Sequence, residues 1–116
     1  MKTVLVTGVA HGIGKAIAAK LSEKYCVIGV DKELPEHIFC DTFYQCDLSN
    51  MQELQETIIQ VKNRCESLYA LVNNAGIFIH KPLKDQSILE WEKIIAVNLT
   101  APYVLSQALS PLLHHG

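Results

Sequence analysis

The stretch Thr7–Gly14, which reads TGVAHGIG, decides the fold of this 116-residue chain. The residues before it, Met1–Val6, are rich in Val and Leu and predict a short buried strand. Behind it, apolar residues at Ile13, Ile17 and Leu21 recur at four-residue spacing and predict a helix. The glycines therefore lie on a strand-to-helix turn. Such a turn directs unpaired main-chain N–H groups and the positive end of a helix dipole at one point, which suits a pyrophosphate group.

Length and composition bound the class of protein. The 116 residues fit one small domain, and 49% hydrophobic with 19% charged residues is typical of a globular chain. A formal net charge of -2 and a pI near 6.2 give no electrostatic case for nucleic acid or an acidic membrane, so we expect small neutral or anionic ligands. The apolar stretch Val4–Val6 is too short for a signal peptide, and no run approaches the roughly 18 apolar residues of a membrane helix. A cytoplasmic protein is the expectation.

Cysteine and histidine show no pattern typical of a metal site. The chain has four cysteines without a C-x-x-C pair, all inside or beside apolar segments: Cys26, Cys40, Cys46 and Cys65. Buried, reduced thiols are therefore preferred to disulfides or a zinc site. The histidines are scattered, apart from His114 and His115, which could bind a stray metal ion but more readily complement a helix dipole.

Strands and helices alternate along the whole chain, as in a parallel sheet covered by crossover helices. The first unit is predicted as strand 3–6, helix 13–24 and strand 26–30, which Asp31 closes. The helix is apolar on one side and charged on the other, so its apolar positions, Ile13 among them, should lie on the sheet.

The middle of the chain predicts a tight crossover followed by a second helix. The polar segment 32–42 leaves room for at most a short helical turn before a third strand at 43–46. Ser49 begins a pattern that reads as a capping box, so a helix should run from about residue 50 to residue 64. One apolar stripe follows this helix: Met51, Leu54, Ile58, Val61 and Cys65.

The last third of the chain predicts one more strand and a long helix. Residues 68–72 are apolar on both faces, as in a parallel strand, and lead into the turn Asn73–Gly76. A second capping box at Ser87 predicts a helix over 88–113.

Pro102 interrupts the hydrogen bonding of this long helix. Its missing N–H would have bonded the carbonyl of Asn98, so that carbonyl is free for water or another group. Such a kink has a structural reading and a functional one, and the hydrogen bonding alone does not favour either.

Five features, in this order along the chain, resemble the short-chain dehydrogenase/reductase family: the glycine motif at 7–14, Asp31 at the end of a strand, Asp47-Leu48, Asn73–Gly76, and Asn98. The glycine motif alone would be weak evidence, because glycines near a helix start can simply be turn chemistry. The resemblance covers essentially the whole chain. It implies an α/β fold, a Rossmann-type doubly wound parallel sheet truncated at about four strands in the order 3-2-1-4. Residues 1–116 would form one dinucleotide-binding domain, incomplete at its C-terminus.

The resemblance implies a set of cofactor-binding residues: Gly8, His11, Gly12, Ile13, Gly14, Asp31, Asp47, Leu48, Asn74, Ala75 and Gly76. In physical terms, Gly8 permits the sharp exit from the strand, Gly12 lets the main chain approach a phosphate, and Gly14 allows close packing of helix on sheet. The resemblance gives Asp47-Leu48 to the adenine and the main chain of Asn74–Gly76 to the ribose. Without the family, both would be read as helix-entry and turn chemistry.

Asp31 indicates which dinucleotide is bound. It lies 23 residues after Gly8, where a carboxylate should accept hydrogen bonds from the adenosine ribose hydroxyls. The same charge would repel a 2′-phosphate, so we expect NAD, with NADP less favoured. His11 and Lys15 could weakly attract a phosphate and keep NADP open.

The resemblance places only one catalytic residue in this chain. The main-chain carbonyl of Asn98 would hold a water linked to the family's catalytic lysine, which agrees with the effect of Pro102. The family's Tyr-x-x-x-Lys pair is absent, since no tyrosine here is followed four residues later by lysine. The expected serine, at the end of a fifth strand, is absent as well. We therefore expect the isolated chain to be inactive.

Three hypotheses follow. The first is an NAD-dependent oxidoreductase of the short-chain type, transferring hydride between nicotinamide and an alcohol or carbonyl substrate. The second is a non-catalytic dinucleotide-binding module, and the third an inert truncation product.

Two apolar surfaces of the predicted fold indicate self-association. Strand 68–72 would be an edge of the sheet with its hydrogen-bonding side bare. Helix 88–113 has more apolar surface than one sheet face can cover, and in the resembling family this region often forms a subunit interface. A homo-oligomer through this helix is therefore expected.

Overall fold

The computed structural model describes residues 1–113, and the predicted pair His114 and His115 lies outside the described residues. Its centre is a sheet of four strands: β1 (Thr3–Thr7), β2 (Cys26–Asp31), β3 (Thr42–Gln45) and β4 (Ala70–Val72). The order is β3-β2-β1-β4 and every pair is parallel, which confirms the predicted strand order and fold class. Leu5 of β1 pairs with Ile28 on one side and with Leu71 on the other.

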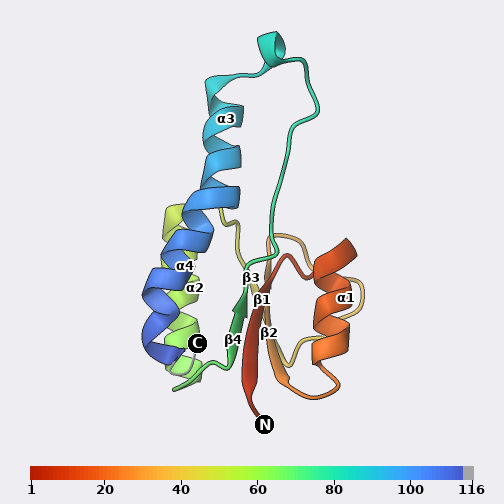
Figure 1. The fold of residues 1–116 in the computed structure, drawn as a ribbon, viewed down its shortest axis with the longest axis vertical. Coiled ribbons are helices and arrows are strands. Elements are labelled where there is room, and N and C mark those ends of the chain that lie inside the picture. The colour runs from red at the N-terminus through yellow and green to blue at the C-terminus, as the bar shows by residue number, and fades with distance from the viewer. Residues whose placement is uncertain (114–116) are drawn as a thin grey trace.

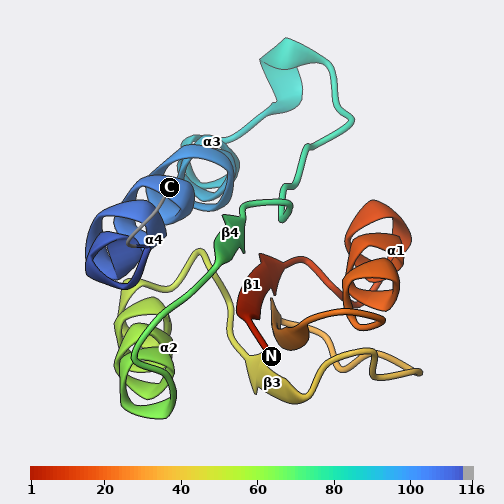
Figure 2. The ribbon, with the colours of Figure 1, turned by 60° about the horizontal axis from the view of Figure 1, so that its bottom comes forward.

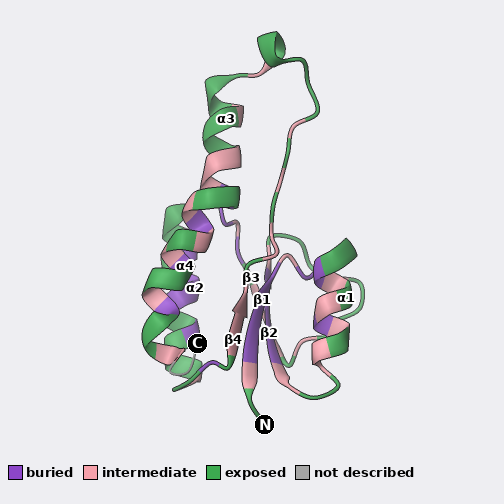
Figure 3. Cartoon of the chain, in the orientation of Figure 1, coloured by how far each residue is buried: buried purple, intermediate pink, exposed green. Residues whose placement is uncertain are grey.

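Helices cover both faces of the sheet, α1 (Gly12–Leu21) on one and α2 (Met51–Arg64) with α4 (Ala101–Leu109) on the other (Figures 1 and 2). Successive side chains of a strand point to opposite faces, so β1 contributes to two cores. The core under α1 contains Val4, Val6, Val9, Ala18 and Val27. The larger core under α2 and α4 includes Leu5, Ile28, Leu54, Val61, Leu105 and Leu109. Figure 3 shows these buried residues along the sheet and the inner helix faces.

Helix α1 faces the sheet with the predicted side except at its first turn, since Ile17 and Leu21 pack against the core under α1. Gly14 and Ala18 are its buried residues, whereas Ile13 is 74% exposed. The prediction that Ile13 packs on the sheet is wrong, because the first turn of α1 lies so near β1 that only a residue without a side chain fits there. An ideal Cβ at Gly14 would lie 1.8 Å from the carbonyl oxygen of Gly8.

The same helix is shorter than predicted. It ends at Leu21 and not at Lys24. The Ser22 hydroxyl donates to the carbonyl of Ala19 (2.7 Å), and residues 22–24 turn the chain toward β2.

Helix α2 spans the predicted residues, but its cap differs. The side chain of Asn50 accepts from the N–H of Glu53 (3.1 Å), so Asn50 is the N-cap. The Ser49 hydroxyl instead donates to Asp47 (2.6 Å). The predicted capping box at Ser49 is therefore wrong, because the neighbouring carboxylate captures the serine. Of the predicted stripe, Leu54, Ile58 and Val61 are buried, Cys65 is half-buried and Met51 is 43% exposed.

The connection between β2 and β3 contains no helix, as its polar composition predicted. Strand β4 is shorter than the predicted 68–72. The N–H of Leu68 donates to the carbonyl of Leu112 (2.9 Å) and not to the sheet. Since β4 ends the strand order, it is an edge of the described sheet, as expected.

The predicted long helix is continuous but not uniform. It comprises α3 (Ile88–Ile95), a π-helical turn (Ala96–Thr100), α4, and a final 3-10 turn (Ser110–Leu112). The capping box at Ser87 is confirmed, with the Ser87 hydroxyl accepting from Glu90 N–H at 3.0 Å and the Glu90 carboxylate accepting from Ser87 N–H at 3.1 Å. The π-turn contains Asn98, four residues before Pro102. A missing backbone donor at Pro102 explains why the regular i to i+4 pattern fails there.

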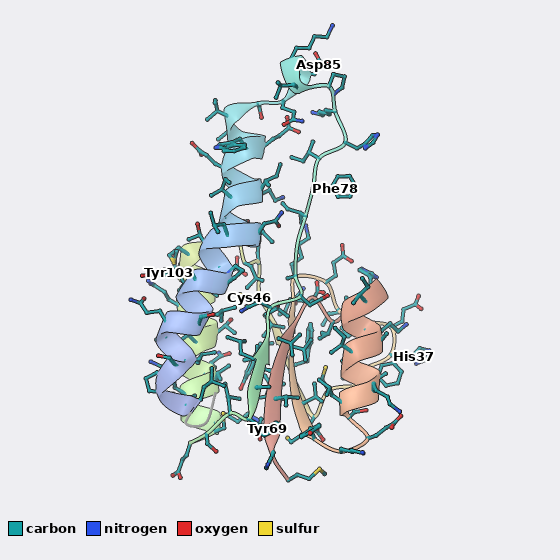
Figure 4. The ribbon with its side chains drawn as sticks, in the orientation of Figure 1. His37, Cys46, Tyr69, Phe78, Asp85 and Tyr103 are labelled. Atoms are coloured by element: carbon teal, nitrogen blue, oxygen red, sulfur yellow. The ribbon has the colours of Figure 1, made fainter. Side chains whose placement is uncertain are left out.

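Helix α3 extends beyond the sheet and has no buried residue (Figures 1 and 3). Ile88, Leu89 and Trp91 are all more than half exposed. Figure 4 likewise shows Phe78 and Tyr103 on the outside of the molecule. None of the helices within residues 1–113 is both long enough and apolar enough to span a bilayer.

We predict that Gly14→Ala destabilises the fold more than Gly12→Ala. A methyl group at Gly14 meets the Gly8 carbonyl, whereas at Gly12 it meets no heavy atom within 4 Å and only the positive φ of 54° opposes it. Overpacking should lower the free energy of unfolding by about 3 kcal/mol at Gly14, against about 1 kcal/mol for strain at Gly12. Urea unfolding followed by circular dichroism measures both. Equal midpoints for the two variants would contradict the close approach of α1 to β1.

Candidate functional site

The carboxyl ends of β1, β2 and β4 and the first turn of α1 surround a cavity of about 350 Å³. Of the eleven predicted cofactor-binding residues, ten line it: Gly8, His11, Ile13, Gly14, Asp31, Asp47, Leu48, Asn74, Ala75 and Gly76. Gly12 does not line it. The structure thus brings together residues that lie up to 68 positions apart in the chain, as the hydrogen bond between Ala75 and Thr7 illustrates.

The glycine turn forms one side of the cavity. Gly8 has a φ of 75°, and its N–H donates to the carbonyl of Val30 at 2.7 Å, which ties the turn to β2. Helix α1 begins at Gly12 without a side-chain cap and without an acidic residue in its first turn. The space beside Gly12 is open to at least 4 Å from an ideal Cβ. An uncapped helix N-terminus facing open space fits a phosphate group.

Asn74 and Thr7 hold this turn in place. The Asn74 side-chain amide donates to the carbonyls of Thr7 (3.1 Å) and Gly8 (3.2 Å). In return, the buried Thr7 hydroxyl accepts from the main-chain N–H groups of Asn74 (3.1 Å) and Ala75 (3.0 Å). The structure therefore gives Asn74 a bracing role that the sequence did not reveal.

Asp31 joins the glycine turn to the loop after β2. One carboxylate oxygen accepts from the N–H of Ala10 (3.0 Å) and the other from the N–H of Glu33 (2.9 Å). A carboxylate offers about four lone-pair positions, so acceptor capacity remains for a ligand's hydroxyl groups.

His11 and Glu33, which both line the cavity, form a further polar contact. The hydrogen bond to Glu33 raises the pKa of His11, and the same bond lowers the pKa of Glu33. Both side chains are exposed, so the pair adds little to stability.

Asp47 and Leu48, which follow β3, also line the cavity. The Asp47 carboxylate accepts from both the hydroxyl (2.6 Å) and the N–H (2.9 Å) of Ser49. The hydrogen bond from the Ser49 side chain holds the pKa of Asp47 below its ordinary value. Leu48 is buried and contributes to the core under α2. Asp47 therefore presents an ionised carboxylate at the end of the sheet.

Asn98 does not line the cavity, but it positions a residue that does. Its side chain forms a pair of hydrogen bonds with the main chain of Ile77, accepting at 2.8 Å and donating at 2.6 Å. This pairing fixes the chain that leaves β4 against the π-turn. The predicted role of the Asn98 main-chain carbonyl stays a prediction.

Sequence reasoning missed several residues around the cavity: Val30, Lys32, Glu33, Cys46, Ile77, Lys93 and Val97. Lys93 is the most informative of them, because its positive charge helps to lower the pKa of Asp47. Lys93 and Val97 are four residues apart, which places them on one helix face. That spacing was the available signal, but only the fold shows that this face borders the cavity.

No tyrosine lines the cavity. Tyr25 and Tyr69 stack on each other with ring centroids 5.4 Å apart, at the amino-terminal end of the sheet (Figure 4). Within residues 1–113, no cluster of three or more His, Cys, Asp or Glu side chains could hold a metal ion. Burial raises the pKa of the Cys40 thiol to about 11, which makes it a poor nucleophile or metal ligand.

Comparison with known proteins agrees with this geometry. The short chain dehydrogenase family profile matches residues 2–116. The chain is 36% identical to 2-dehydro-3-deoxy-D-gluconate 5-dehydrogenase of Pseudoalteromonas atlantica, over 93% of this chain and 47% of that protein. It spans about half the length of the curated relatives it matches.

Two solved structures show the same fold with different cofactors. One is a 4-hydroxyisoleucine dehydrogenase complexed with NADH, with a TM-score of 0.87 and 31% identity over 95% of this chain and 48% of that one. The other is a metagenomic short-chain oxidoreductase in complex with NADP, with a TM-score of 0.83 and 30% identity over 97% and 56%. The chain described here belongs to the short-chain dehydrogenase/reductase family and corresponds to its N-terminal, dinucleotide-binding half.

Proposed function

We propose that this chain forms the dinucleotide-binding half of an NAD-dependent oxidoreductase acting on an alcohol or carbonyl substrate. The gathering of ten predicted residues around one cavity, beside an uncapped helix N-terminus, carries the proposal. When bound, the nicotinamide ring supplies the hydride donor or acceptor. The chain's own residues bind and orient the dinucleotide.

Each part of the cavity fits one part of the dinucleotide. The glycine turn, whose residues Gly8, His11 and Gly14 line the cavity at the uncapped start of α1, would hold the pyrophosphate. The remaining acceptor capacity of Asp31 suits the adenosine ribose hydroxyls, and its charge disfavours a 2′-phosphate. Asp47 with Leu48 would hold the adenine, and the main chain of Asn74–Gly76 would border the second ribose.

The chain lacks the groups that move the proton in this reaction. A Tyr-x-x-x-Lys pair, in which the ammonium group lowers the pKa of the tyrosine, is absent from the 116 residues. We therefore propose that the isolated chain binds the dinucleotide without turning over substrate. A non-catalytic dinucleotide-binding module is the second candidate, and an inert truncation product is the third.

We predict that the folded chain binds NADH and has no dehydrogenase activity. Isothermal titration calorimetry should show saturable binding to a sample that first gives a cooperative melt by circular dichroism. A cooperative melt without heat of NADH binding would contradict the proposed function. A melt without any cooperative transition would favour the truncation product. Extending the reading frame beyond residue 116 separates enzyme from module, because only an enzyme needs the tyrosine and lysine downstream.

We predict that Asp31→Ala weakens NADH binding and brings NADH and NADPH closer in affinity. Loss of hydrogen bonds to a charged group costs about 1.5–3 kcal/mol, or roughly 10- to 100-fold in affinity for NADH. Competitive titration with both cofactors measures the change. Asp85→Ala is the matched control, since Asp85 lies at the far tip of the loop before α3 (Figure 4). Unchanged affinities in Asp31→Ala would show that the assignment of Asp31 is wrong.

We also propose that α3 contacts a second copy of the chain. The helix has no buried residue, yet Ile88, Leu89 and Trp91 present a large apolar surface. Burying such side chains contributes about 1.5–3 kcal/mol each, which favours association.

We predict that Leu89→Glu lowers the self-association of the chain at least tenfold, because a charge would then be buried in the interface. Sedimentation equilibrium gives the association constant. Ile59→Glu is the control, because Ile59 is an equally aliphatic, exposed residue on α2. A wild-type chain that stays monomeric at millimolar concentration would refute the contact.

A further inference from the structure

His11 is one of the predicted cofactor-binding residues, but its pairing with Glu33 has no assigned role so far. The Nε2 atom of His11, at the N-cap of α1, contacts the Oε2 atom of Glu33, in the loop after β2. Both residues line the cavity. Their side chains are 72% and 54% exposed, so the contact lies at the surface of the molecule and not within the core.

Asp31 lies between the two members of this pair. Its carboxylate accepts from the N–H of Ala10, the residue before His11, and from the N–H of Glu33 itself. The glycine turn, Asp31 and Glu33 therefore form a closed ring of contacts. Any group bound by the free acceptor positions of Asp31 must lie next to the charges of His11 and Glu33.

The surrounding charges are few and can be named. Glu33 and Asp31 both act on His11 by attraction, and Lys15 of α1 acts by repulsion. Lys32, which lines the cavity beside Asp31, attracts Glu33. Within this group, protonation of His11 changes the sum of the charges by one unit.

We propose that Glu33 is a second specificity-determining residue for the dinucleotide, which excludes a 2′-phosphate by its own charge and by engaging the side chain of His11. This inference rests on the proposed function, which places the adenosine ribose at Asp31. His11 sits at the helix N-terminus and would otherwise be available to a phosphate. With Glu33 present, the imidazole is already paired.

The exclusion of a 2′-phosphate should depend on pH, because His11 titrates. Below the pKa of His11 the pair carries no net charge, and above it the pair carries one negative charge, so discrimination against a 2′-phosphate strengthens as pH rises. Because Glu33 raises the pKa of His11, the change occurs at a higher pH than for a free imidazole. A phosphate monoester itself titrates near pH 6, so a variant without the imidazole is needed as a reference.

The test compares adenosine 5′-monophosphate with adenosine 2′,5′-bisphosphate, two ligands that differ only in the 2′-phosphate. Calorimetry at pH 6 and pH 8 gives the affinity for adenosine 5′-monophosphate divided by the affinity for adenosine 2′,5′-bisphosphate. This affinity ratio is measured for the wild type and for Glu33→Gln. Removing one negative charge near the phosphate should lower the ratio about five- to tenfold at both pH values. Glu36→Gln is the matched control, since it removes the same charge from the same loop at a residue that does not line the cavity.

A second readout follows His11 directly. In an NMR titration of the imidazole, Glu33→Gln should lower the pKa of His11, and Glu36→Gln should leave it unchanged. In His11→Gln, the difference in affinity ratio between pH 6 and pH 8 should shrink to that of the phosphate alone. An imidazole that titrates identically in wild type and Glu33→Gln would overturn the pairing.

The outcomes separate this inference from the function on which it rests. If the folded chain binds neither nucleotide, the proposed function fails and this inference fails with it. If adenosine 5′-monophosphate binds normally but Glu33→Gln and Glu36→Gln give equal ratios, only the role of Glu33 is refuted.

Discussion

The close approach of α1 to the end of β1 is the constraint on which the rest of the structure depends. A Cβ at Gly14 would lie 1.8 Å from the carbonyl oxygen of Gly8, so the helix can dock there only because that atom is missing. The docked turn is then braced by Asn74 and by the Thr7 hydroxyl, from two neighbouring strand ends. This arrangement fixes where the main-chain donors of the first helical turn point. The cavity, its candidate phosphate position and the location of Asp31 all follow from it.

Local sequence patterns were sufficient to predict most of the fold. They failed where two groups compete for the same hydrogen-bond partner or for the same place on the sheet. Apolar runs predicted the strands, and the resemblance to a known family implied their order. The capping box at Ser87 was read correctly, because its partners are three residues apart. Ser49 was misread as a cap because Asp47 captures its hydroxyl, a competition that spacing cannot show. Ile13 was misplaced for a similar reason. Helical periodicity identifies an apolar side but not how near the helix lies to the sheet, and here nearness selects Gly14.

The residues of the candidate site likewise divide into those that the sequence could predict and those that it could not. Its glycines and Asp31 could be predicted, because a motif of fixed spacing places them on adjoining loops. Glu33 and the pairing of Asn98 with Ile77 could not, since each is a side-chain contact between residues more than 20 positions apart. Nothing in the local composition marks such partners. They are determined by where the loops end after the sheet has formed, which is a property of the packed chain.

The two sides of the cavity differ in how firmly they are held. The glycine turn rests on β1, whose residues Leu5 and Val6 are fully buried, so moving it would require opening the core. The side formed by α3 and the chain after β4 has no comparable support. Helix α3 has no buried residue, and the π-turn that follows it is joined to Ile77 by two hydrogen bonds of the Asn98 side chain. Segments with few buried contacts open locally at a small fraction of the global unfolding free energy. The side of the cavity formed by the glycine turn is therefore preformed, whereas the side next to α3 depends on whatever packs against that helix.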